Sequence, residues 1–288
     1  MSAPQNTPLT VALVGGSGFI GRAVMRQLVA QGHSVRLLSR TTPAFPLPAN
    51  VTWFYANTAH PDTLTPHLSN CHAVVHLVAV LAERGTPFTT TITQSAAHTA
   101  QAARAAGVPH FVYISALGAS PTSPSRYAQA KAMAESAVRN AYPTATLLRP
   151  SLVIGNGGGF RQQIEQLTRH LPLMVLPGMG RSRFQPIDLT TLATLIAHHT
   201  MKPSTQPLTL NAVGPQVLSF RQITRTELSL LHRRRLLLPL PWWATWAVAY
   251  LFQAADSLTR HRLIPAWLLV TPDQVRLLQQ ENIENTDS

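Results

Sequence analysis

The fold is decided by one stretch near the start of the chain, Val11-Ala12-Leu13-Val14-Gly15-Gly16-Ser17-Gly18-Phe19-Ile20-Gly21-Arg22. Its apolar beginning predicts a strand over residues 9–14, and the pattern after it predicts a helix over residues 19–31. Two glycine patterns occupy the turn between them: G-x-G-x-x-G through Gly16, Gly18 and Gly21, and the related G-x-x-G-x-x-G from Gly15. In such a turn, glycines permit a tight bend, a close approach of backbone to a pyrophosphate, and close packing of helix on strand.

The helix after this turn presents free N–H groups and a partial positive charge to a bound phosphate. The sequence therefore predicts a dinucleotide-binding loop, and the alternative is a glycine turn without a ligand. We expect contacts to the dinucleotide from Gly15, Gly16, Ser17, Gly18, Phe19, Ile20 and Gly21.

The rest of the first 150 residues alternates apolar runs with amphipathic stretches, which is typical of a parallel α/β sheet. Further strands are predicted at 35–38, 51–55, 73–80, 111–114 and 144–148, and helices at 92–106 and 125–140. The fold class is therefore α/β, a Rossmann-like doubly wound parallel sheet. We expect residues 1–150 to form this nucleotide-binding domain.

After residue 150 the regular alternation stops, and glycines and prolines crowd residues 155–159 and 172–180. We expect residues 151–288 to form a smaller, irregular C-terminal cap over the carboxyl edge of the sheet, partly interleaved with it. A helix is predicted at 189–199, with Asp188 as its N-cap, and a strand at 208–213.

The amino-acid composition excludes several classes of protein. The chain has 288 residues, of which 45% are hydrophobic and 12% charged, and this composition excludes intrinsic disorder. Cys71 is its one cysteine, which excludes a disulfide scaffold. The net charge of +12 attracts phosphorylated ligands and anionic surfaces. No nucleic-acid-binding motif accompanies the charge, and the N-terminus lacks a secretory signal, so we expect a cytoplasmic protein that does not bind nucleic acid.

The residues after the second predicted strand favour NADP(H) over NAD(H). NAD-binding proteins usually place an acid about 20 residues past the loop, to bind the ribose 2′-hydroxyl. This chain has no acid there before Asp62 and instead offers Arg40, flanked by the hydroxyls of Ser39 and Thr41. A guanidinium suits a 2′-phosphate. The alternative is that Arg40 is a solvated loop charge.

A tyrosine and a lysine stand one helical turn apart in Tyr127-Ala128-Gln129-Ala130-Lys131. The chain has only two lysines, Lys131 and Lys202, so a lysine at this spacing is notable. An ammonium beside a phenol lowers the phenol pKa and makes it a usable acid or base. Ser115, at the end of the fifth predicted strand, is placed to bind a substrate oxygen. The alternative is a surface Tyr/Lys pair.

These features together resemble the extended and atypical short-chain dehydrogenase/reductases, the group that includes NAD-dependent epimerases and dehydratases. More narrowly, the chain is similar to the nucleotide-binding accessory subunit of respiratory complex I and its bacterial relatives. The segments that carry this likeness are 113–119, 123–127, 148–155, 183–186 and Asp273-Gln274-Val275-Arg276-Leu277-Leu278.

The resemblance implies a bound nicotinamide dinucleotide, usually NADPH in the accessory subunit. It implies Ser115, Tyr127 and Lys131 as catalytic residues, with Lys131 also at the nicotinamide ribose. The cofactor-binding set then includes Asn57, Ala79, Tyr127, Lys131 and Pro150. Asn57 stands where such proteins often have Gly-Asp after the third strand, which is a departure from the family pattern.

The segment at 232–252 joins a basic run to an apolar, tryptophan-rich one: His232-Arg233-Arg234-Arg235 is followed by Trp242, Trp243 and Trp246. This composition is typical of a segment that lies on an anionic membrane, and its prolines discourage a continuous spanning helix. The alternative is a helix packed on the cap. The chain's twelve histidines come with no cysteine or acid to complete a ligand set, so no metal is expected.

Two functional hypotheses follow. The first is a nucleotide-binding protein like the complex I accessory subunit. It would be a peripheral protein on the inner face of the membrane, held on the membrane surface or on a respiratory complex through residues 232–252. The second is an active NADP-dependent reductase, dehydrogenase or epimerase that acts on a small or lipid-like substrate through Tyr127 and Lys131.

Overall fold

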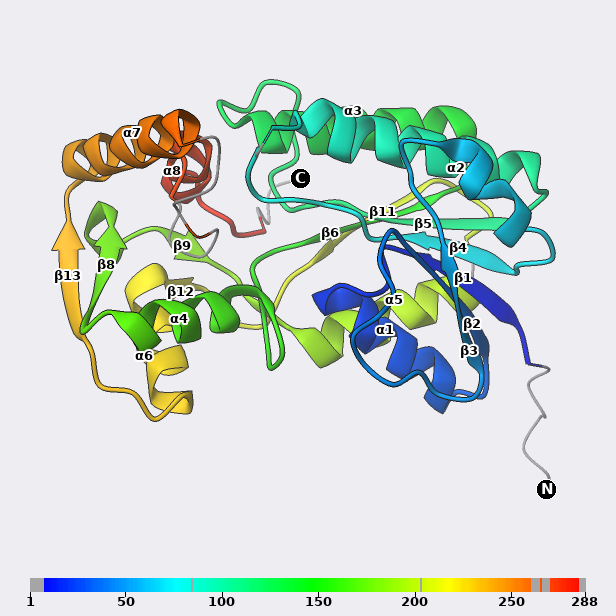
Figure 1. Ribbon diagram of the computed structural model, residues 1–288, viewed down its shortest axis with the longest axis horizontal. Helices are drawn as coiled ribbons and strands as arrows, with labels where there is room; N and C mark the ends of the chain where they lie inside the picture. Colours follow the sequence, from blue (N-terminus) through cyan, green and yellow to red (C-terminus); the bar gives the residue numbers. More distant parts are fainter. Residues whose placement is uncertain (1–7, 84, 203, 260–264, 266–269, 285–288) are drawn as a thin grey trace.

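Seven parallel strands form one twisted sheet in the order β11-β6-β5-β4-β1-β2-β3 (Figure 1). This computed structural model describes residues 8–83, 85–202, 204–259, 265 and 270–284. The strands are β1 (Thr10–Val14), β2 (Ser34–Ser39), β3 (Val51–Tyr55), β4 (Ala73–His76), β5 (His110–Ile114), β6 (Thr146–Pro150) and β11 (Leu208–Ala212). β4 is buried throughout, because helices cover both faces of the sheet. The predicted fold class is confirmed.

Two pairs of helices cover the sheet. On one face lie α1 (Phe19–Ala30) and α5 (Leu189–Met201), which share a core with β1 and β2. On the other lie α2 (Ser95–Ala105) and α3 (Arg126–Ala141), whose buried alanines allow close approach to β4 and β5 (Figure 1). A π-helical turn, η3 (Thr89–Gln94), precedes α2, and two short turns, η1 (Pro61–Thr63) and η2 (Thr65–His67), follow β3.

The fourth strand is shorter than its apolar run predicts. The run extends to residue 80, but β4 ends at His76. Beyond it, the chain turns across the glycine loop, and a Cβ added to Gly15 would lie 2.9 Å from Val78 Cγ2. Leu77 and Val78 therefore pack on the loop at the carboxyl edge of the sheet and do not extend the strand.

Most of the chain after residue 150 forms a smaller layer beside the sheet, whereas α5 and β11 belong to the sheet layer itself (Figure 1). Three two-stranded pairs, β10–β7, β12–β9 and β13–β8, hold the smaller layer together. Its elements are β7 (Val153–Ile154), α4 (Gly159–His170), β8 (Leu173–Pro177), η4 (Gly178–Gly180), β9 (Arg183–Phe184), β10 (Ile187–Asp188), β12 (Leu218–Ser219), α6 (Phe220–Leu230), β13 (Leu236–Leu240), α7 (Trp242–Leu258) and α8 (Pro272–Gln279).

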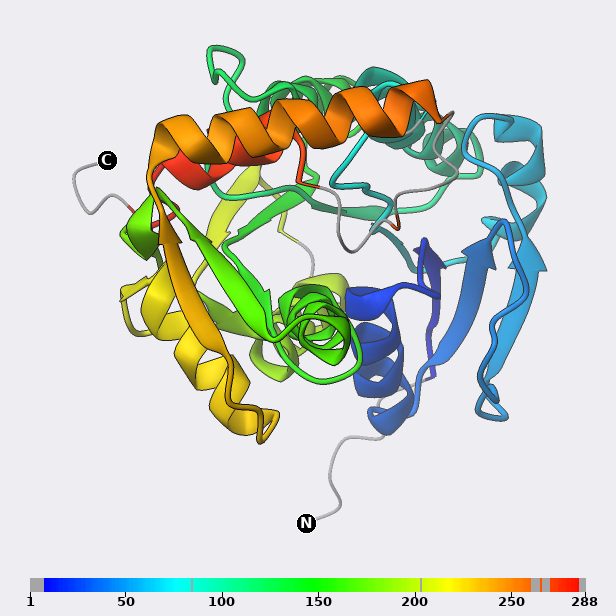
Figure 2. The ribbon, with the colours of Figure 1, turned by 60° about the vertical axis from the view of Figure 1, so that its left-hand side comes forward.

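Two features of this layer bear on the site. α4 lies beside α1, so a segment from the second half of the chain meets the glycine loop (Figure 2). α7 and α8 pack together, and α8 contacts α3 on the face of the sheet opposite α1 and α5 (Figure 1). Asp188 caps α5 as predicted, since its side chain accepts from the N–H groups of Thr190 and Thr191.

Candidate functional site

The glycine loop is packed so tightly that side chains do not fit in it. Gly15 has φ of +79° and donates its N–H to Leu38 O over 2.9 Å. A Cβ on Gly21 would lie 2.5 Å from both the Cα and the O of Gly16, closer than real Cβ contacts come. The first turn of α1 therefore lies directly on the loop, and the backbone stays bare where a pyrophosphate would approach.

The N-terminus of α1 is left open for an anion. Gly18 is the N-cap and has no side chain to bond the first turn, which contains no acid. The first bond back to the cap comes from the N–H of Arg22, to Gly18 O at 3.0 Å. The earlier N–H groups of a helix have no intrahelical partner. The loop therefore fits the phosphates of a dinucleotide.

A second glycine run completes this loop from the other half of the chain. Cβ atoms on Gly158 and Gly159 would lie 2.4 and 2.7 Å from the Phe19 ring. The Arg22 guanidinium donates to Gly157 O and stacks over Phe45, 5.8 Å from its ring centroid. Sequence reasoning assigned this run to the cap without a role. The crowding of glycines was the available signal, but a sequence does not reveal which ring those glycines face.

The residues predicted to select the cofactor lie after β2. The Ser39 hydroxyl donates to Thr41 O at 2.8 Å and accepts from Trp53 Nε1 at 3.0 Å, so it shapes the loop. Arg40 is exposed and makes no hydrogen bond or ion pair with any residue that the structure describes. Its guanidinium is therefore available to a ligand at this edge.

Asn57, Ala79 and Pro150 are placed at the ends of three different strands. The Asn57 side chain accepts from Ala59 N–H at 3.1 Å, which closes the turn after β3. Ala79 is exposed in the loop after β4. Pro150 is buried at the end of β6, where its carbonyl accepts from Leu117 N–H at 2.8 Å.

Of the three predicted catalytic residues, Lys131 links the other two, Ser115 and Tyr127. It is 1% exposed, its Nζ donates to Ile114 O at 2.8 Å, and Nζ lies 6.0 Å from the Tyr127 ring centroid. Ser115 follows Ile114, and its buried Oγ has no hydrogen-bond partner among the described residues. α3 and the end of β5 thus bring Ser115, Tyr127 and Lys131 together at the carboxyl edge of the sheet.

The electrostatics of this group differ from the sequence prediction. Burial raises the pKa of Tyr127 to about 12 and lowers the pKa of Lys131 to about 7. The expectation that Lys131 lowers the pKa of Tyr127 is therefore wrong for this geometry. The lysine faces the ring and donates a hydrogen bond to Ile114 O, so loss of solvent dominates at the phenol.

One acid, Glu135, raises the pKa of Lys131 and so partly offsets the larger effect of burial. Glu135, one turn further along α3, is bound by Arg149 through contacts of 2.8 and 2.6 Å. The Tyr113 ring lies 5.1 Å from Lys131 Nζ, and its buried hydroxyl has no partner among the residues described. His76 lies on the same face of the sheet, and burial lowers its pKa to about 3. The rings that lie next to the lysine ammonium are therefore uncharged.

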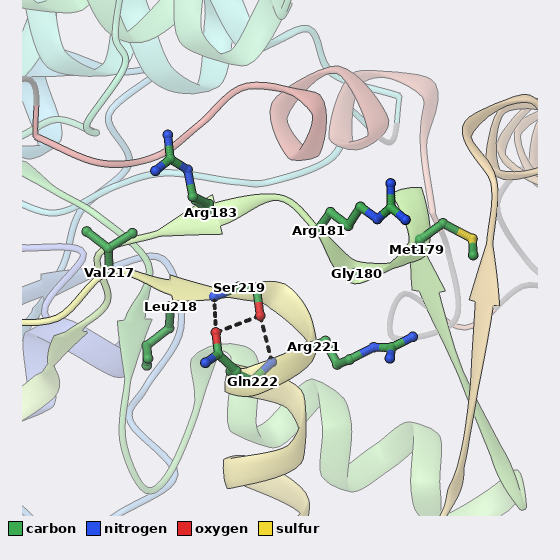
Figure 3. Close-up of a pocket in the computed structure, with 9 residues that line it drawn as sticks. All are labelled: Met179, Gly180, Arg181, Arg183, Val217, Leu218, Ser219, Arg221 and Gln222. Carbon is green, nitrogen blue, oxygen red and sulfur yellow. Dashed lines mark hydrogen bonds between the residues drawn. The ribbon is translucent and has the colours of Figure 1, made fainter.

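A cavity of about 430 Å³ lies in the cap, apart from these residues (Figure 3). It is lined by Met179, Gly180, Arg181, Arg183, Val217, Leu218, Ser219, Arg221 and Gln222. Arg183 forms a bidentate ion pair with Glu281, whereas the buried Arg221 Nε has no partner in the described parts of the chain. No residue predicted from the sequence as catalytic or cofactor-binding lines this cavity. Within the described residues, no group of three side chains could hold a metal ion.

The basic and tryptophan-rich segment is more engaged in the fold than its composition suggests. Arg233 and Arg235 donate to carbonyls of the last turns of α4, including Thr168 O and Leu171 O. Helix ends leave these carbonyls without donors, which is why arginines bind there. Of Trp242, Trp243 and Trp246, only Trp243 is exposed, at 76%. Arg233 and Arg235 are therefore occupied within the fold, whereas Arg234 and Trp243 stay exposed.

Comparison with known proteins agrees with the geometry. A family model described as NAD(P)H-binding matches residues 15–170. A mitochondrial protein of Arabidopsis thaliana, NADH dehydrogenase [ubiquinone] 1 alpha subcomplex subunit 9, is 26% identical over 81% of this chain and 61% of its own length. A protein of Caulobacter vibrioides named ceramide reductase is 28% identical over 96% of this chain and 84% of its own length. This chain thus spans less than two thirds of the plant relative.

Solved structures show the same fold. The Bordetella bronchiseptica enzyme WbmG, in complex with NAD, has a TM-score of 0.67 at 16% identity, over 83% of this chain and 84% of that one. The structure named gox2253 has a TM-score of 0.68 at 19% identity, over 96% and 89%. At such identities the likeness concerns the fold alone. The resemblance seen in the sequence is confirmed by the family match and the relatives.

The burial of Lys131 predicts a pH-dependent stability. Between pH 7 and pH 10 the unfolded chain binds a proton on Lys131 that the folded chain does not, so the free energy of unfolding rises with pH. The rise is at most about 1.4 kcal/mol per pH unit for one proton. We expect urea unfolding at pH 7, 8 and 9 to show this rise in the wild type and a flatter profile in Lys131→Met. Identical profiles in the two proteins would contradict the assignment.

Proposed function

This chain belongs to the NAD(P)H-binding family, and from that premise we propose that it is an NADP(H)-preferring oxidoreductase of the short-chain dehydrogenase/reductase type. The observation that carries the proposal is the group formed by Ser115, Tyr127 and Lys131. Its two hydroxyls have no hydrogen-bond partner among the described residues, although Ser115 Oγ is buried. Buried, unpartnered donors are costly to a fold, and they are common where a substrate supplies the partner.

The proposed substrate is the carbonyl group of a lipid-like molecule. The Caulobacter relative named ceramide reductase covers 96% of the chain, which supports a reductase that works on a lipid. Reduction also suits the protonation state of the site. A phenol with a pKa of about 12 holds its proton at neutral pH and can give it to a substrate oxygen.

Each residue has one role in the proposed mechanism. A bound reduced nicotinamide would supply the hydride, with its pyrophosphate held by Gly15 to Gly21. Ser115 Oγ–H donates a hydrogen bond to the carbonyl oxygen, and Tyr127 O–H donates the proton. Lys131 would donate to the ribose hydroxyls of the bound dinucleotide, and its pKa of about 7 lets it change charge near neutral pH. The aromatic rings next to Lys131 exclude water from the site.

The preference for NADP(H) rests on Arg40. Its guanidinium is exposed at the edge of the sheet where a ribose 2′-phosphate would lie, and it makes no competing ion pair with a described residue. Asn57 carries no charge to repel that phosphate.

A second candidate function is attachment to a membrane surface, as expected of a protein like the complex I subunit. α7 buries only Thr245, Ala249 and Asp256. Its outer face exposes Trp243, Leu251 (71%) and Leu258 (84%), and the neighbouring pair β8–β13 exposes Leu236 (70%). We propose an anionic bilayer as the occupant of this surface, because the exposed Arg181 and Arg234 flank it and no exposed acid lies on α7.

This attachment is interfacial. Among the helices of the described residues, none combines the length and apolar character needed to cross a bilayer. The exposed apolar face of α7 and β13 would instead lie at the headgroup level. A lipid substrate and a membrane-facing surface fit one protein, so the two candidate functions are compatible.

We expect calorimetric titration to give tighter binding of NADPH than of NADH. Arg40→Ala should weaken NADPH by about 1.5 kcal/mol or more, because a charge-assisted contact is lost, and should leave NADH nearly unchanged. Arg26→Ala, an exposed arginine on α1, is the control for the lost charge. Equal binding of NADH and NADPH by the wild type would exclude the role of Arg40, and binding of neither would exclude the nucleotide site.

We expect Tyr127→Phe to abolish NADPH oxidation with long-chain keto-lipids while leaving NADPH affinity nearly intact, because only the proton donor is removed. Lys131→Ala should reduce both activity and affinity. Tyr55→Phe, on the exposed end of β3, is the matched control. Full activity of Tyr127→Phe would remove this residue from the mechanism.

We expect the wild type to float with anionic liposomes at low salt and less at high salt, because screening weakens the charge contribution. The double variant Trp243→Ser, Leu251→Ser should stay in the soluble fraction. Met133→Ser, an exposed apolar position on α3, should float like the wild type. Failure of the wild type to float at low salt would contradict the surface. Arg234→Ala is the variant that tests the charge contribution to membrane binding. Arg233 and Arg235 are unsuitable for this test because they cap α4, so replacing them would also disturb the fold.

A further inference from the structure

One motif has no part in the proposed chemistry, namely Asp273 to Leu278 on α8. The chain from Thr271 to Glu284 passes beside the catalytic group: Asp273 accepts from Tyr127 N–H, and Asn282 donates to Leu117 O, two residues past Ser115. Thr271 starts α8 with a capping box to Gln274, so the helix begins at a defined residue. This places Asp273 in the first turn, facing the start of α3.

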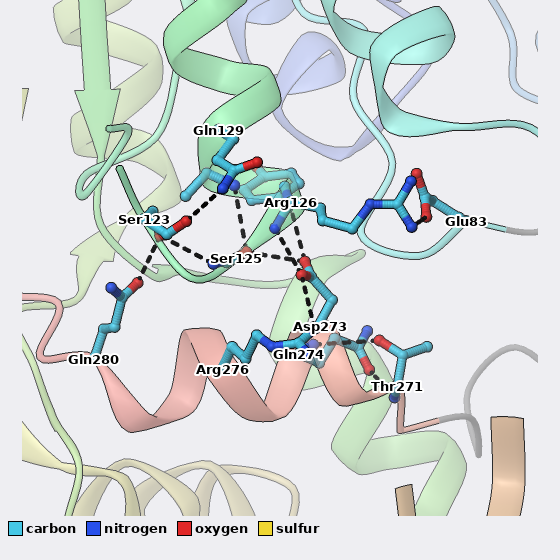
Figure 4. A network of polar contacts seen from close by, with 12 residues as sticks. Glu83, Ser123, Ser125, Arg126, Gln129, Thr271, Asp273, Gln274, Arg276 and Gln280 are labelled. Atoms are coloured by element: carbon cyan, nitrogen blue, oxygen red, sulfur yellow. Dashed lines mark hydrogen bonds and ion pairs between the residues drawn. The ribbon is translucent and has the colours of Figure 1, made fainter. Parts of the chain in front are cut away.

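Asp273 caps a helix that is nearly 150 residues away in sequence. Its Oδ1 accepts from Arg126 N–H at 2.7 Å, and its Oδ2 accepts from Tyr127 N–H at 3.2 Å. Oδ2 also accepts from the hydroxyl of Ser125 at 2.9 Å. Ser125 in turn accepts from Ala128 N–H at 3.3 Å. One carboxylate and one hydroxyl therefore satisfy the open N–H groups of the first turn of α3 (Figure 4).

The position of Tyr127 makes this cap more than a stability device. Tyr127 is the second residue of α3, and helix ends fray where their N–H groups lack acceptors. The neighbouring Lys131 is one full turn inside the helix and is held at Ile114 O. The Tyr127 ring packs edge-on against Phe88, with centroids 5.7 Å apart, but its hydroxyl has no hydrogen bond to a described residue. The backbone N–H to Asp273 is therefore the hydrogen bond that helps set where its phenol lies.

The same C-terminal segment also holds the loop after Ser115. Asn282 Nδ2 donates to Leu117 O at 3.1 Å, and Ser151 Oγ donates to Asn282 Oδ1 at 2.6 Å. Ser123 Oγ donates to Gln280 Oε1 at 3.2 Å. The segment thus anchors the loop that leads from Ser115 to α3 at both of its ends.

α8 is in turn braced by α7. Arg276 lies 3.8 Å from Asp273 Oδ1, and its guanidinium stacks 5.5 Å from the Trp246 ring centroid. Trp246 itself stacks on Tyr250, with centroids 5.7 Å apart. The Asp273 carboxylate is 12% exposed, so its bonds compete little with water.

We propose that Asp273 is the positioning residue for Tyr127, holding the start of α3 so that the phenol and Ser115 face one substrate oxygen. The proposal rests on the proposed function in one respect, namely that Tyr127 is the proton donor. Asp273 touches neither substrate nor cofactor in this assignment, and it acts through the backbone of Tyr127.

The test compares the wild-type protein with Asp273→Asn by amide hydrogen exchange and by 13Cζ-tyrosine NMR, with the Tyr127 signal assigned through Tyr127→Phe. We expect exchange at residues 126–128 to rise about tenfold, as a charge-assisted cap is lost. The Tyr127 signal should shift or broaden while those of the other tyrosines stay. NADPH affinity, measured with NADPH itself, should change less than about twofold.

Glu281→Gln is the matched control. It neutralises an acid in the same segment, which pairs with the exposed Arg183 and, among the described residues, has no hydrogen bond or ion pair to α3. Its exchange at 126–128 should equal that of the wild type. If Asp273→Asn does not fold, Ser125→Ala carries the test, with a rise of about threefold expected because one bond to Asp273 remains on each of Arg126 and Tyr127.

Unchanged exchange and an unchanged Tyr127 signal in a folded Asp273→Asn would overturn the proposal. Where turnover is measured, kcat should fall about tenfold at constant KM, since a misplaced proton donor affects the transition state. An equal fall in Glu281→Gln would also overturn it. Absence of turnover in the wild type would count against the proposed function alone, because exchange and NMR do not depend on activity.

Discussion

The contact on which the rest of the structure depends is the one between Gly21 and Gly16, where the first turn of α1 lies on the backbone of the loop before it. A Cβ at Gly21 would overlap three backbone atoms of Gly16. Because the helix can approach so closely, its N-terminus points at the edge of the sheet between β1 and β4. The loop also carries Phe19 outward, and there Gly158 and Gly159 pack against its ring and bring the start of α4 to the same edge. One close packing thus joins the two halves of the chain.

A second constraint is the exclusion of water around Lys131. A lysine that is 1% exposed, beside neutral aromatic rings, loses the solvation that keeps its ordinary pKa. The same burial acts in the opposite direction on Tyr127. The site therefore presents a phenol that keeps its proton and an amine near the midpoint of its titration at neutral pH. This pairing suits proton delivery to a carbonyl oxygen better than proton removal from a hydroxyl.

The C-terminal segment links these two regions. α8 lies between the outward-facing α7 and the start of α3. Asp273 on α8 accepts from Tyr127 N–H, and Asn282 after α8 donates to Leu117 O, two residues past Ser115. Backbone groups at a helix start or in a loop require partners when they are partly buried. The fold supplies those partners from residues at the far end of the chain. The exposed apolar surface of α7 and the group formed by Ser115, Tyr127 and Lys131 are consequently parts of one packed unit.

The sequence by itself determined the sheet, the glycine loop and the Tyr-x-x-x-Lys helix, because each depends on local periodicity and on spacing within a few residues. It also indicated Asp188 as a helix cap, since a cap and its helix are adjacent in the chain. Tertiary structure alone decided the pKa of Tyr127, which depends on burial among residues from several elements. It likewise decided that Arg233 and Arg235 bind the end of α4, and that Asp273 caps α3. Those contacts join residues that lie about 65 to 150 positions apart, and only the folded chain brings them within hydrogen-bond distance.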